Sequence, residues 1–509
     1  MVTNMKKCNR SIIACMLIGS LLIGCSSMRT SKSQYTGMIE KLRNNDFESC
    51  LIQIEEAKQK HYKEKEKVLF YLDAGMLYHY IGDYKKSNEY LEKAEFAIEE
   101  LYTKSIGKAA ASVLLNDNAL DYFGEDYEDI YLNVFKALNY LHMDDLEDAF
   151  VEIKRIDNKL NLLEDKYKKI ADEYNKSDDK KKEFKIGDIK FYNSALARYL
   201  SMLLYQAEGK FDDAKIDLKE IREAIENQPA VYDFEVPHLD SHIARTDSIP
   251  LYFISFVGNS PDKKSNTLWV HTEKDMLIIA TKQELTEEDL EKVRSKKVKS
   301  TPFFGTKTTS YSSSQGSVHQ QKQIEKEISA TGTFDIIEWE DMEAGYHFKF
   351  DLPYMDLIGT DIAKIIIFIN EQMVQELTPI ESMEKVAFVT YKIKEPLIYL
   401  KTITRTVAKG LLAESAKQEM VNQVGDNLLG KLAMIATDVG MDATENADLR
   451  ISRFFPAQAF VGHVLLEEGM YNIRINYYDS NNTLVYSDVK NQQKITEDGF
   501  HLYESFYLD

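Results

Sequence analysis

The sequence predicts a multidomain α+β protein, in which an array of helical hairpins is followed by a mostly β-stranded part. The chain has 509 residues, which is too long for a single hydrophobic core. Up to about residue 228 the apolar residues recur with the period of one helix face, and from residue 248 they form short runs of strand-forming residues. The predicted organisation is a signal peptide (1–24), a spacer (25–34), helical repeats (35–228), a mostly β domain (248–400) with a low-complexity loop (300–323), and a helical hairpin with terminal strands (401–509).

The first 25 residues have the order of a bacterial lipoprotein signal. Three basic residues precede an uncharged apolar run over residues 11–23, which is too short to span a bilayer as a resident helix. The run ends in Leu22-Ile23-Gly24-Cys25, which resembles the lipobox, where the cysteine sulfur takes a diacylglyceryl group and the peptide is cut before it. The alternative is an ordinary secretory signal with a chance cysteine. We expect Cys25 to carry the lipid.

The residues after Cys25 predict where such a tether would hold the protein. Several acyl chains together anchor a protein stably to a membrane. Ser26 and Ser27 follow the cysteine without an aspartate at the second position, and by resemblance to enterobacterial sorting this favours the outer membrane over the inner one. The small, polar residues up to Ser33 are typical of a flexible spacer. The expected location is therefore the bacterial cell envelope.

Composition excludes several classes of function. The net charge of the chain is −20, and losing residues 1–24 removes three basic residues and no acidic one, which makes it about −23. An acidic surface of this kind disfavours nucleic acid as a partner, because phosphate neutralisation supplies most of that affinity. After the signal peptide and Cys25, only Cys50 remains, so an intramolecular disulfide and a multi-cysteine metal site are excluded.

A short pattern recurs four times in the first half. It begins at Phe47, Tyr84, Leu146 and Phe211, and each of these is followed by a small residue three positions on and an aliphatic one four further on. These offsets lie on one helix face. Second amphipathic segments precede the last three copies, with glycine in two of the turns. The pattern resembles the tetratricopeptide repeat, although only the first spacing is near its usual period of about 34 residues. A plain helical bundle is the alternative.

The pattern of the second half predicts strands, interrupted by one helical segment. Strand-sized runs begin at Leu251 and continue to 386–393, and three more follow between residues 460 and 487, the last two forming a hairpin. Residues 306–317 are rich in Ser and Thr and predict a long exposed loop. Residues 403–439 have helical periodicity and many small side chains. Their charges argue against a transmembrane span, so they predict a helical hairpin.

No catalytic signature is present in the sequence, which has no nucleophile elbow, phosphate-binding loop, zinc-binding His-Glu-x-x-His or dinucleotide glycine pattern. We expect no catalytic residue, no metal site and no cofactor. The candidate cluster consists of Arg405 and Lys409, which share a helix face, with Asp448 and Arg450. These four residues predict either an anionic ligand site or a buried charge network that fixes the junction between helix and strand.

Three patches carry a resemblance to a family of TPR-containing bacterial envelope lipoproteins of unknown biochemistry. The patches are 116–141, then Gly258, Pro261 and Lys263 with Leu352-Pro353, and then Arg405 and Lys409 with 447–450 and Pro456-Ala457. The sequence departs from the family at Ile451-Ser452, where Ser-Trp is usual, and at Glu467-Glu468, where prolines are usual. The resemblance implies an exported lipoprotein, and a setting similar to proteins encoded near lipoprotein activators of penicillin-binding proteins implies a link to cell-wall synthesis.

These observations predict a non-enzymatic scaffold. A repeat array offers an extended binding surface rather than a catalytic centre. The expected partners are a protein bound by the array and a membrane bound through the lipid. The alternative is a glycan-binding module, for example for peptidoglycan, or an enzyme in the β-rich half. A deep pocket around the four-residue cluster would favour the alternative, and burial of those residues in mutual pairs would favour the scaffold.

Overall fold

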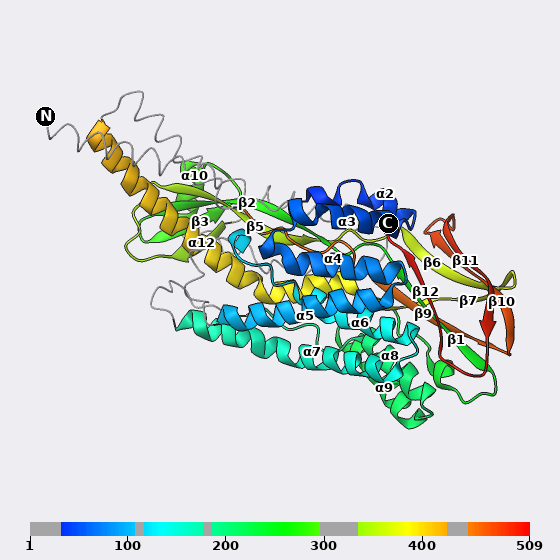
Figure 1. Cartoon of the computed structure of the whole chain (residues 1–509). Coiled ribbons are helices and arrows are strands. Elements are labelled where there is room, and N and C mark those ends of the chain that lie inside the picture. Colours follow the sequence, from blue (N-terminus) through cyan, green and yellow to red (C-terminus); the bar gives the residue numbers. More distant parts are fainter. Residues whose placement is uncertain (1–31, 107–116, 177–185, 296–333, 425–445) are drawn as a thin grey trace.

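The computed structural model describes residues 32–106, 117–176, 186–295, 334–424 and 446–509. In these residues the chain is α+β, with helices in the first half and three sheets in the second (Figure 1). Residues 1–31, which include the predicted signal peptide and Cys25, lie outside the described part, as does the predicted low-complexity loop. The α+β class is confirmed.

The helical half consists of four helix pairs, each joined by a three-residue turn. The pairs are α2 (Met38–Arg43) with α3 (Phe47–His61), α4 (Lys67–Tyr80) with α5 (Tyr84–Ile106), α6 (Asp126–His142) with α7 (Leu146–Asn175), and α8 (Ala195–Ala207) with α9 (Phe211–Asn227). Short 3-10 turns flank them at Ser33–Tyr35, Glu64–Glu66, Asp117–Ala119 and Asp240–Ile243. The second helix of every pair begins at one of the four pattern residues, so the prediction that these four segments are helical is confirmed.

All four turns have the same backbone geometry. The middle turn residue is left-handed in each case, namely Asn45 (φ 53°), Gly82 (φ 81°), Asp144 (φ 58°) and Gly209 (φ 73°). The next residue then donates its N–H to the carbonyl five positions earlier, at 2.8–3.0 Å in all four pairs. This is the Schellman closure of a helix C-terminus. Glycine marks only two of the turns, because Asn and Asp also tolerate this conformation.

The small residues of the pattern are where helices meet closely. Their side chains are fully buried in all four repeats, at Cys50, Ser87, Ala149 and Ala214. Gly75 of α4 adds to this packing, because a Cβ there would lie 2.7 Å from Leu91 of α5. These small side chains therefore permit close packing of the helices.

Three four-stranded sheets form the second half. Sheet A has the order β12-β1-β9-β8, sheet B the order β4-β3-β2-β5, and sheet C the order β11-β10-β6-β7. The strands are β1 (Ile249–Val257), β2 (Asp262–Glu273), β3 (Met276–Ala280), β4 (Phe334–Glu338), β5 (His347–Asp356), β6 (Ile362–Ile369), β7 (Gln372–Glu376), β8 (Thr378–Ser382), β9 (Gln458–Leu466), β10 (Gly469–Asp479), β11 (Leu484–Ile495) and β12 (His501–Tyr507). The predicted terminal hairpin is β10 with β11.

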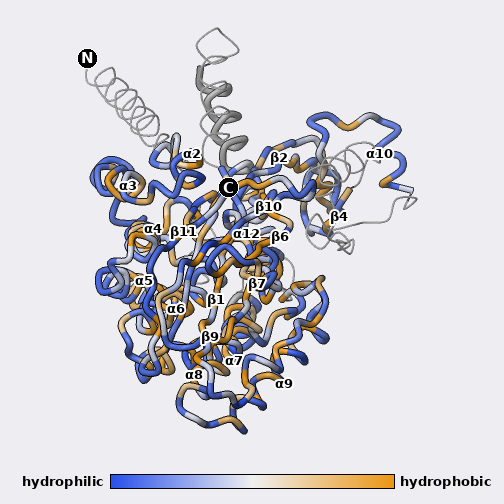
Figure 2. The backbone as a smooth tube through the Cα atoms, turned by 90° about the vertical axis from the view of Figure 1, so that its right-hand side faces the viewer, coloured by the Kyte–Doolittle hydropathy of each residue, from blue (hydrophilic) through white to orange (hydrophobic). Residues whose placement is uncertain are grey.

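Sheet A lies between the helices and sheet C, with strand β1 buried on both faces. Tyr252, Ile254 and Phe256 join the core formed with the helices, whereas Leu251 and Phe253 face the core formed with sheet C. This alternation follows the two-residue period of a strand. Figure 2 shows the apolar stretches of β1 and β9 in the middle of the molecule.

The predicted units at 248–400 and 401–509 share this sheet. Strand β1 pairs antiparallel with β9 and parallel with β12, and both partners come from the last 52 residues of the chain. One continuous apolar core runs from Met38 in α2 to Leu508 beyond β12. The helical array and the C-terminal strands therefore cannot separate without exposing that core.

The prediction of a strand at 386–393 is wrong. These residues belong to α12 (Met383–Val424), which packs against α6, α7, β5 and β9 and so is apolar on nearly every side. A short apolar run of this kind cannot distinguish a fully buried helix from a buried strand. The helix predicted to begin at residue 403 is the continuation of α12. The predicted second arm of the hairpin falls in residues 425–445, which are not among the described residues.

Helix α12 also carries sheet B at one end of the molecule. Tyr399, Ile403 and Val407 fill the core of that sheet. Gly410 lies against the ring of Phe348 on β5, so closely that a Cβ would collide with the ring. The small residue thus permits the close approach that the sequence predicted for this segment. A short helix, α10 (Glu287–Arg294), packs on the other face of sheet B.

We expect the helices and sheet A to unfold together. Phe256 is fully buried on β1, with Phe135 of α6 at 5.3 Å and Phe506 of β12 at 5.8 Å between ring centroids. Phe256→Ala should lower the free energy of unfolding by about 3–5 kcal/mol, because it leaves a cavity in the shared core. Denaturation followed by far-UV circular dichroism and by hydrogen exchange at β1 should show both signals shifting together.

The matched control is Leu162→Ala on α7, where the side chain is 60% exposed and little change is expected. A helical transition that stayed at its wild-type position in Phe256→Ala would contradict the shared core.

Candidate functional site

The four predicted cluster residues lie in two places. Arg405 is buried in α12, where its guanidinium donates to Thr402 Oγ1 at 3.5 Å, and Lys409 lies half-buried one turn further on. Asp448 and Arg450 lie in the extended segment before β9, and Arg450 donates to both carboxylate oxygens of Asp448, at 2.9 and 2.8 Å. The ion pair that Asp448 makes in the described part of the chain is with Arg450, not with the two α12 cations.

Arg450 is held by the helical array as well as by Asp448. Its two terminal nitrogens donate to the carbonyl oxygens of Leu120 and Asp117, at 2.9 and 2.8 Å, and its guanidinium lies 5.3 Å from the ring centroid of Tyr122. Burial opposes ionisation of Asp448, but the charge and hydrogen bonds of Arg450 lower the pKa of Asp448 well below its usual range. The pair therefore stays ionised and joins the C-terminal half to the segment before α6.

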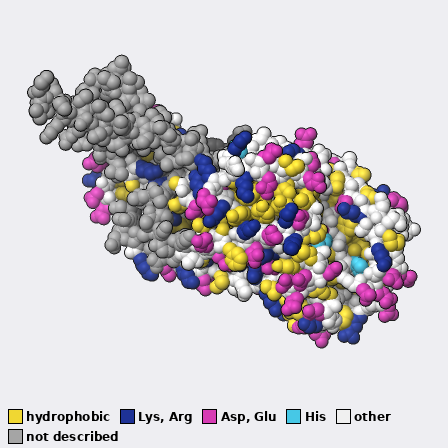
Figure 3. Space-filling view, viewed as in Figure 1, with side chains coloured by type: hydrophobic (Ala, Val, Ile, Leu, Met, Phe, Trp, Pro, Cys, Tyr) yellow, Lys and Arg dark blue, Asp and Glu magenta, His cyan; other side chains and the backbone are white. Residues whose placement is uncertain are grey.

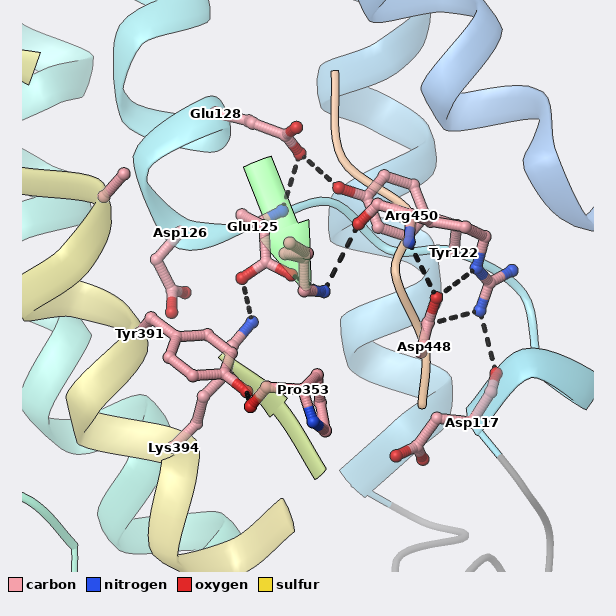
Figure 4. A network of polar contacts seen from close by, with 12 residues as sticks. Asp117, Tyr122, Glu125, Asp126, Glu128, Pro353, Tyr391, Lys394, Asp448 and Arg450 are labelled. Atoms are coloured by element: carbon pink, nitrogen blue, oxygen red, sulfur yellow. Dashed lines mark hydrogen bonds and ion pairs between the residues drawn. The ribbon is translucent and has the colours of Figure 1, made fainter. Parts of the chain in front are cut away.

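Glu125, directly before α6, bridges two lysines, one on a strand and one on another helix. Its carboxylate lies 2.6 Å from Lys263 of β2 and 2.6 Å from Lys394 of α12 (Figure 4). All three side chains are buried, and the ammonium group of Lys263 also donates to the carbonyl oxygen of Arg450 at 3.3 Å. Burial disfavours the charged form of Lys394, but the charges of Glu125 and Asp126 raise its pKa. The network thus ties α6, β2, α12 and the segment before β9 together.

Two more buried carboxylates continue this network. Glu128 accepts hydrogen bonds from Tyr122 Oη, the Glu125 N–H and the Ser452 N–H, each at 2.7 Å. Ser452 Oγ in turn donates to Asp73 of α4 at 2.7 Å. Burial, with the charge of Glu125, raises the pKa of Glu128 to about 7, and burial raises the pKa of Asp73 to about 6.

The three patches that carry the family resemblance meet in this network. Glu125 comes from the first, Lys263 and Pro353 from the second, and Arg450 from the third, while Tyr391 of α12 donates to the carbonyl oxygen of Pro353 at 2.6 Å. Every charged group at the centre has a partner of opposite charge or a hydrogen bond within the protein. Such an arrangement fixes segments in position and leaves little room for a ligand.

Two further buried carboxylates fasten the inner face of the array to sheet A. Glu381 of β8 accepts from Tyr131, Ser194, Tyr232 and the Leu196 N–H, at 2.6–3.0 Å. Burial raises the pKa of Glu381.

Glu504 of β12 is the second of these carboxylates and lies between two histidines. It is 3.2 Å from His79 and 2.7 Å from His142. Burial by itself would raise the pKa of Glu504, but the charge of His79 and the hydrogen bonds of both rings lower it to about 2. Helices α4, α6 and α8 are thus bound to the protein's own strands.

A cavity of about 350 Å³, lined mostly by polar residues, lies elsewhere, between the end of α2 and the outer edge of the β-rich half. Its lining residues are Arg43, Asp361, Asp479, Ser480, Asn481, Val485, Tyr507 and Asp509. None of the four predicted cluster residues belongs to it. In the described residues there is no group of three or more metal-ligating side chains, and no helix there has the length and apolarity needed to cross a bilayer.

Comparisons with protein-family models, with characterised proteins and with solved structures gave no match.

Sequence reasoning singled out only some of the residues that make these contacts. Asp448 and Arg450 are in the predicted cluster, and Glu125 and Lys263 are in the patches of resemblance. Lys394 and Glu381 were missed, because a single charge beside an apolar run reads as the exposed end of an element. The sequence does contain a signal for Lys394. This charged residue directly follows the run 386–393, whose apolar residues cover nearly the whole circumference of a helix.

We expect stability to depend on pH through Glu128. Because the pKa of Glu128 is raised to about 7 in the folded chain, the group keeps its proton well above its ordinary pKa of 4.5. The folded state therefore binds more protons in this window, and the free energy of unfolding should fall as pH rises through it, by about 2 kcal/mol between pH 5 and 8. Glu128→Gln imitates the protonated form, so denaturant titrations across this range should give a flatter profile for the variant.

Glu223→Gln, in an exposed ion pair with Lys219 on α9, serves as the control and should leave the wild-type profile unchanged. Equal slopes for wild type and Glu128→Gln would overturn the assignment of the proton to Glu128.

Proposed function

We propose that the protein is a non-enzymatic scaffold of the bacterial cell envelope, tethered by a lipid on Cys25 and binding a protein partner through its helical array. The tether rests on the sequence, which combines a basic start, a short apolar run and Leu22-Ile23-Gly24-Cys25. Lys32 follows Cys25 by only seven residues, which reach at most about 25 Å when fully extended. The body of the protein would therefore stay close to the membrane that holds the lipid.

The observation that carries the scaffold proposal is the enclosure of the charged cluster. Asp448 and Arg450 pair with each other, and their side chains are only 15% and 3% exposed. A site for an anionic ligand needs a cation with free hydrogen-bond donors, whereas the donors of Arg450 are directed at Asp448, Asp117 and Leu120. The geometry supports a structural role for these residues and argues against a catalytic one.

The four equivalent helix pairs support a TPR-like array. In arrays of this kind the first helices of the pairs line the inner face. Here α4, α6 and α8 are buried against sheet A, with Tyr80, Phe135 and Tyr199 in the common core. The proposed partner would therefore bind the outer side, where the second helices expose an aliphatic residue at the same position of three repeats, at Ile52, Val151 and Ile216.

The proposed site of action is the envelope, with the outer membrane favoured over the inner one by Ser26 and Ser27. The resemblance to TPR-containing envelope lipoproteins supports a link to cell-wall synthesis. A glycan-binding role in the β-rich half is the second candidate, and the cavity beside Asp361 and Asp479 favours it, because carboxylates and Asn481 suit sugar hydroxyls.

We expect Cys25→Ala to release the protein from membranes into the soluble fraction. The variant loses the only cysteine at which the lipobox pattern places the acyl chains, and their burial supplies about 0.8 kcal/mol per CH₂. Fractionation of cells expressing the full chain, with detection by immunoblot, measures this. Cys50→Ala is the control, since Cys50 is fully buried in α3. Retention of Cys25→Ala in membranes would contradict the tether.

The scaffold itself is tested by site-specific photo-crosslinking in intact envelopes. A photoreactive residue at Ile52 or Ile216 should give a discrete adduct with one protein, identified by mass spectrometry. Met373 on β7 is the matched control, because all three side chains are 59% exposed. Adducts from Met373 alone would move the binding function to the β-rich half, and the absence of protein adducts from both array positions would overturn the proposal.

A further inference from the structure

The outer side of the array carries a patch of aromatic rings beneath lysines. The Tyr–Lys patch consists of Tyr71 and Tyr78 on α4, Tyr90, Lys86 and Lys93 on α5, and Lys58 on α3. In the space-filling view it lies over α4, where hydrophobic side chains gather with lysines among them (Figure 3). The three tyrosines are only partly buried, and all three lysines are exposed.

The rings contact one another along the surface. Tyr78 stacks on Tyr90 with centroids 5.3 Å apart and an interplanar angle of 18°, and Tyr71 lies 6.3 Å from Tyr90. Phe70, buried beneath them, is 5.9 Å from Tyr90. The rings thus form a continuous apolar surface on α4 and α5 and not a set of scattered side chains.

Each of the three lysines lies over a ring of this surface. The distances from ammonium to centroid are 4.3 Å for Lys58 over Phe70, 5.1 Å for Lys86 over Tyr78 and 4.9 Å for Lys93 over Tyr90. Contacts of this type at exposed sites contribute only about 0.5–1 kcal/mol, so an incoming carboxylate can redirect the ammonium groups at small cost.

The hydroxyl groups of the patch are also available. Within the described residues the hydroxyls of Tyr71 and Tyr78 form no hydrogen bond, and that of Tyr90 reaches only Glu55, at 3.4 Å. A surface that combines rings, free hydroxyl donors and ammonium groups is suited to apolar side chains alternating with carboxylates. Its three lysines present positive charge on a chain whose net charge is −20.

We propose that the Tyr–Lys patch is the docking surface for an acidic, apolar segment of a partner protein, one that places aromatic or aliphatic side chains on the tyrosines and carboxylates beside the lysines. The inference rests on the proposed scaffold function and assigns it a surface. A protein segment fits better than an anionic membrane, because Asp83 at 3.2 Å from Lys86 and the nearby Glu55 add negative charge that a dense layer of anionic headgroups would oppose. A protein segment can place its carboxylates selectively.

The test is selection of peptides from a random 12-residue display library on the immobilised full chain. We expect enrichment of Asp and Glu together with aromatic or aliphatic residues. The best peptide, labelled for fluorescence anisotropy, should lose at least tenfold in affinity for Lys58→Glu/Lys86→Glu/Lys93→Glu. The charge-matched control changes Lys274, Lys292 and Lys494 to Glu, all exposed in the β-rich half and away from the patch, and should bind as the wild type does.

Circular dichroism of the patch variant establishes that it is folded, and Tyr78→Ala offers a second variant without a change of charge. Selection without an acidic-apolar preference, or equal affinity for wild type and the patch variant, would overturn the inference. Binding of the wild type to vesicles containing phosphatidylglycerol, lost in the patch variant and without any peptide binding, would overturn it as well. The peptide selection can fail while a photoreactive residue at Ile216 still gives a protein adduct. That result would refute the patch as the docking surface and leave the scaffold proposal in place.

Discussion

The buried carboxylate of Glu125 needs two lysines as ion-pair partners, and the rest of the fold depends on this constraint. Its carboxylate is 2.6 Å from Lys263 of β2 and 2.6 Å from Lys394 of α12, in a place that water does not reach. A buried charge without its partners costs about 3–5 kcal/mol. The ions are therefore satisfied only when α6, β2 and α12 are all in position, so the network selects one relative placement of helices and sheets rather than adding much to stability.

The apolar core makes the same connection without that specificity. It runs from α2 through β1 and β9 to the end of the chain, so the array and sheet A are stabilised together. Hydrophobic contact tolerates sliding, because it depends on buried area and not on direction. Glu381 and Glu504 remove that freedom, since each needs donors from named positions on α6, α8 and α4. Burial thus supplies the driving force, and the carboxylates fix the register between the helices and the strands.

Sequence patterns predicted the elements whose causes are local. The helix pairs follow from the spacing of Phe47, Tyr84, Leu146 and Phe211, and the strands at 251 and 460 from their composition. The elements that were missed depend on distant partners. Residues 386–393 are helical because other elements surround them, and β12 exists because its backbone pairs with β1, about 250 residues away. The candidate site divides in the same way: Asp448 and Arg450 are two residues apart and were found, whereas Lys394 acquires its role only from Glu125.

The filled inner face changes what the array can do for a partner. A repeat array whose first helices were free would present a concave surface. Here Phe135 and Tyr199 of those helices are buried in the core shared with the protein's own strands. A partner would then bind the sides of the array that sheet A leaves exposed, on the second helices and on the solvent side of α4. Tyr71, Tyr78 and Tyr90 are costly residues to leave exposed there, since their rings bury only part of their area and two of their hydroxyls have no partner in the described chain. Folding does not require that arrangement, whereas the proposed recognition of another chain would use it.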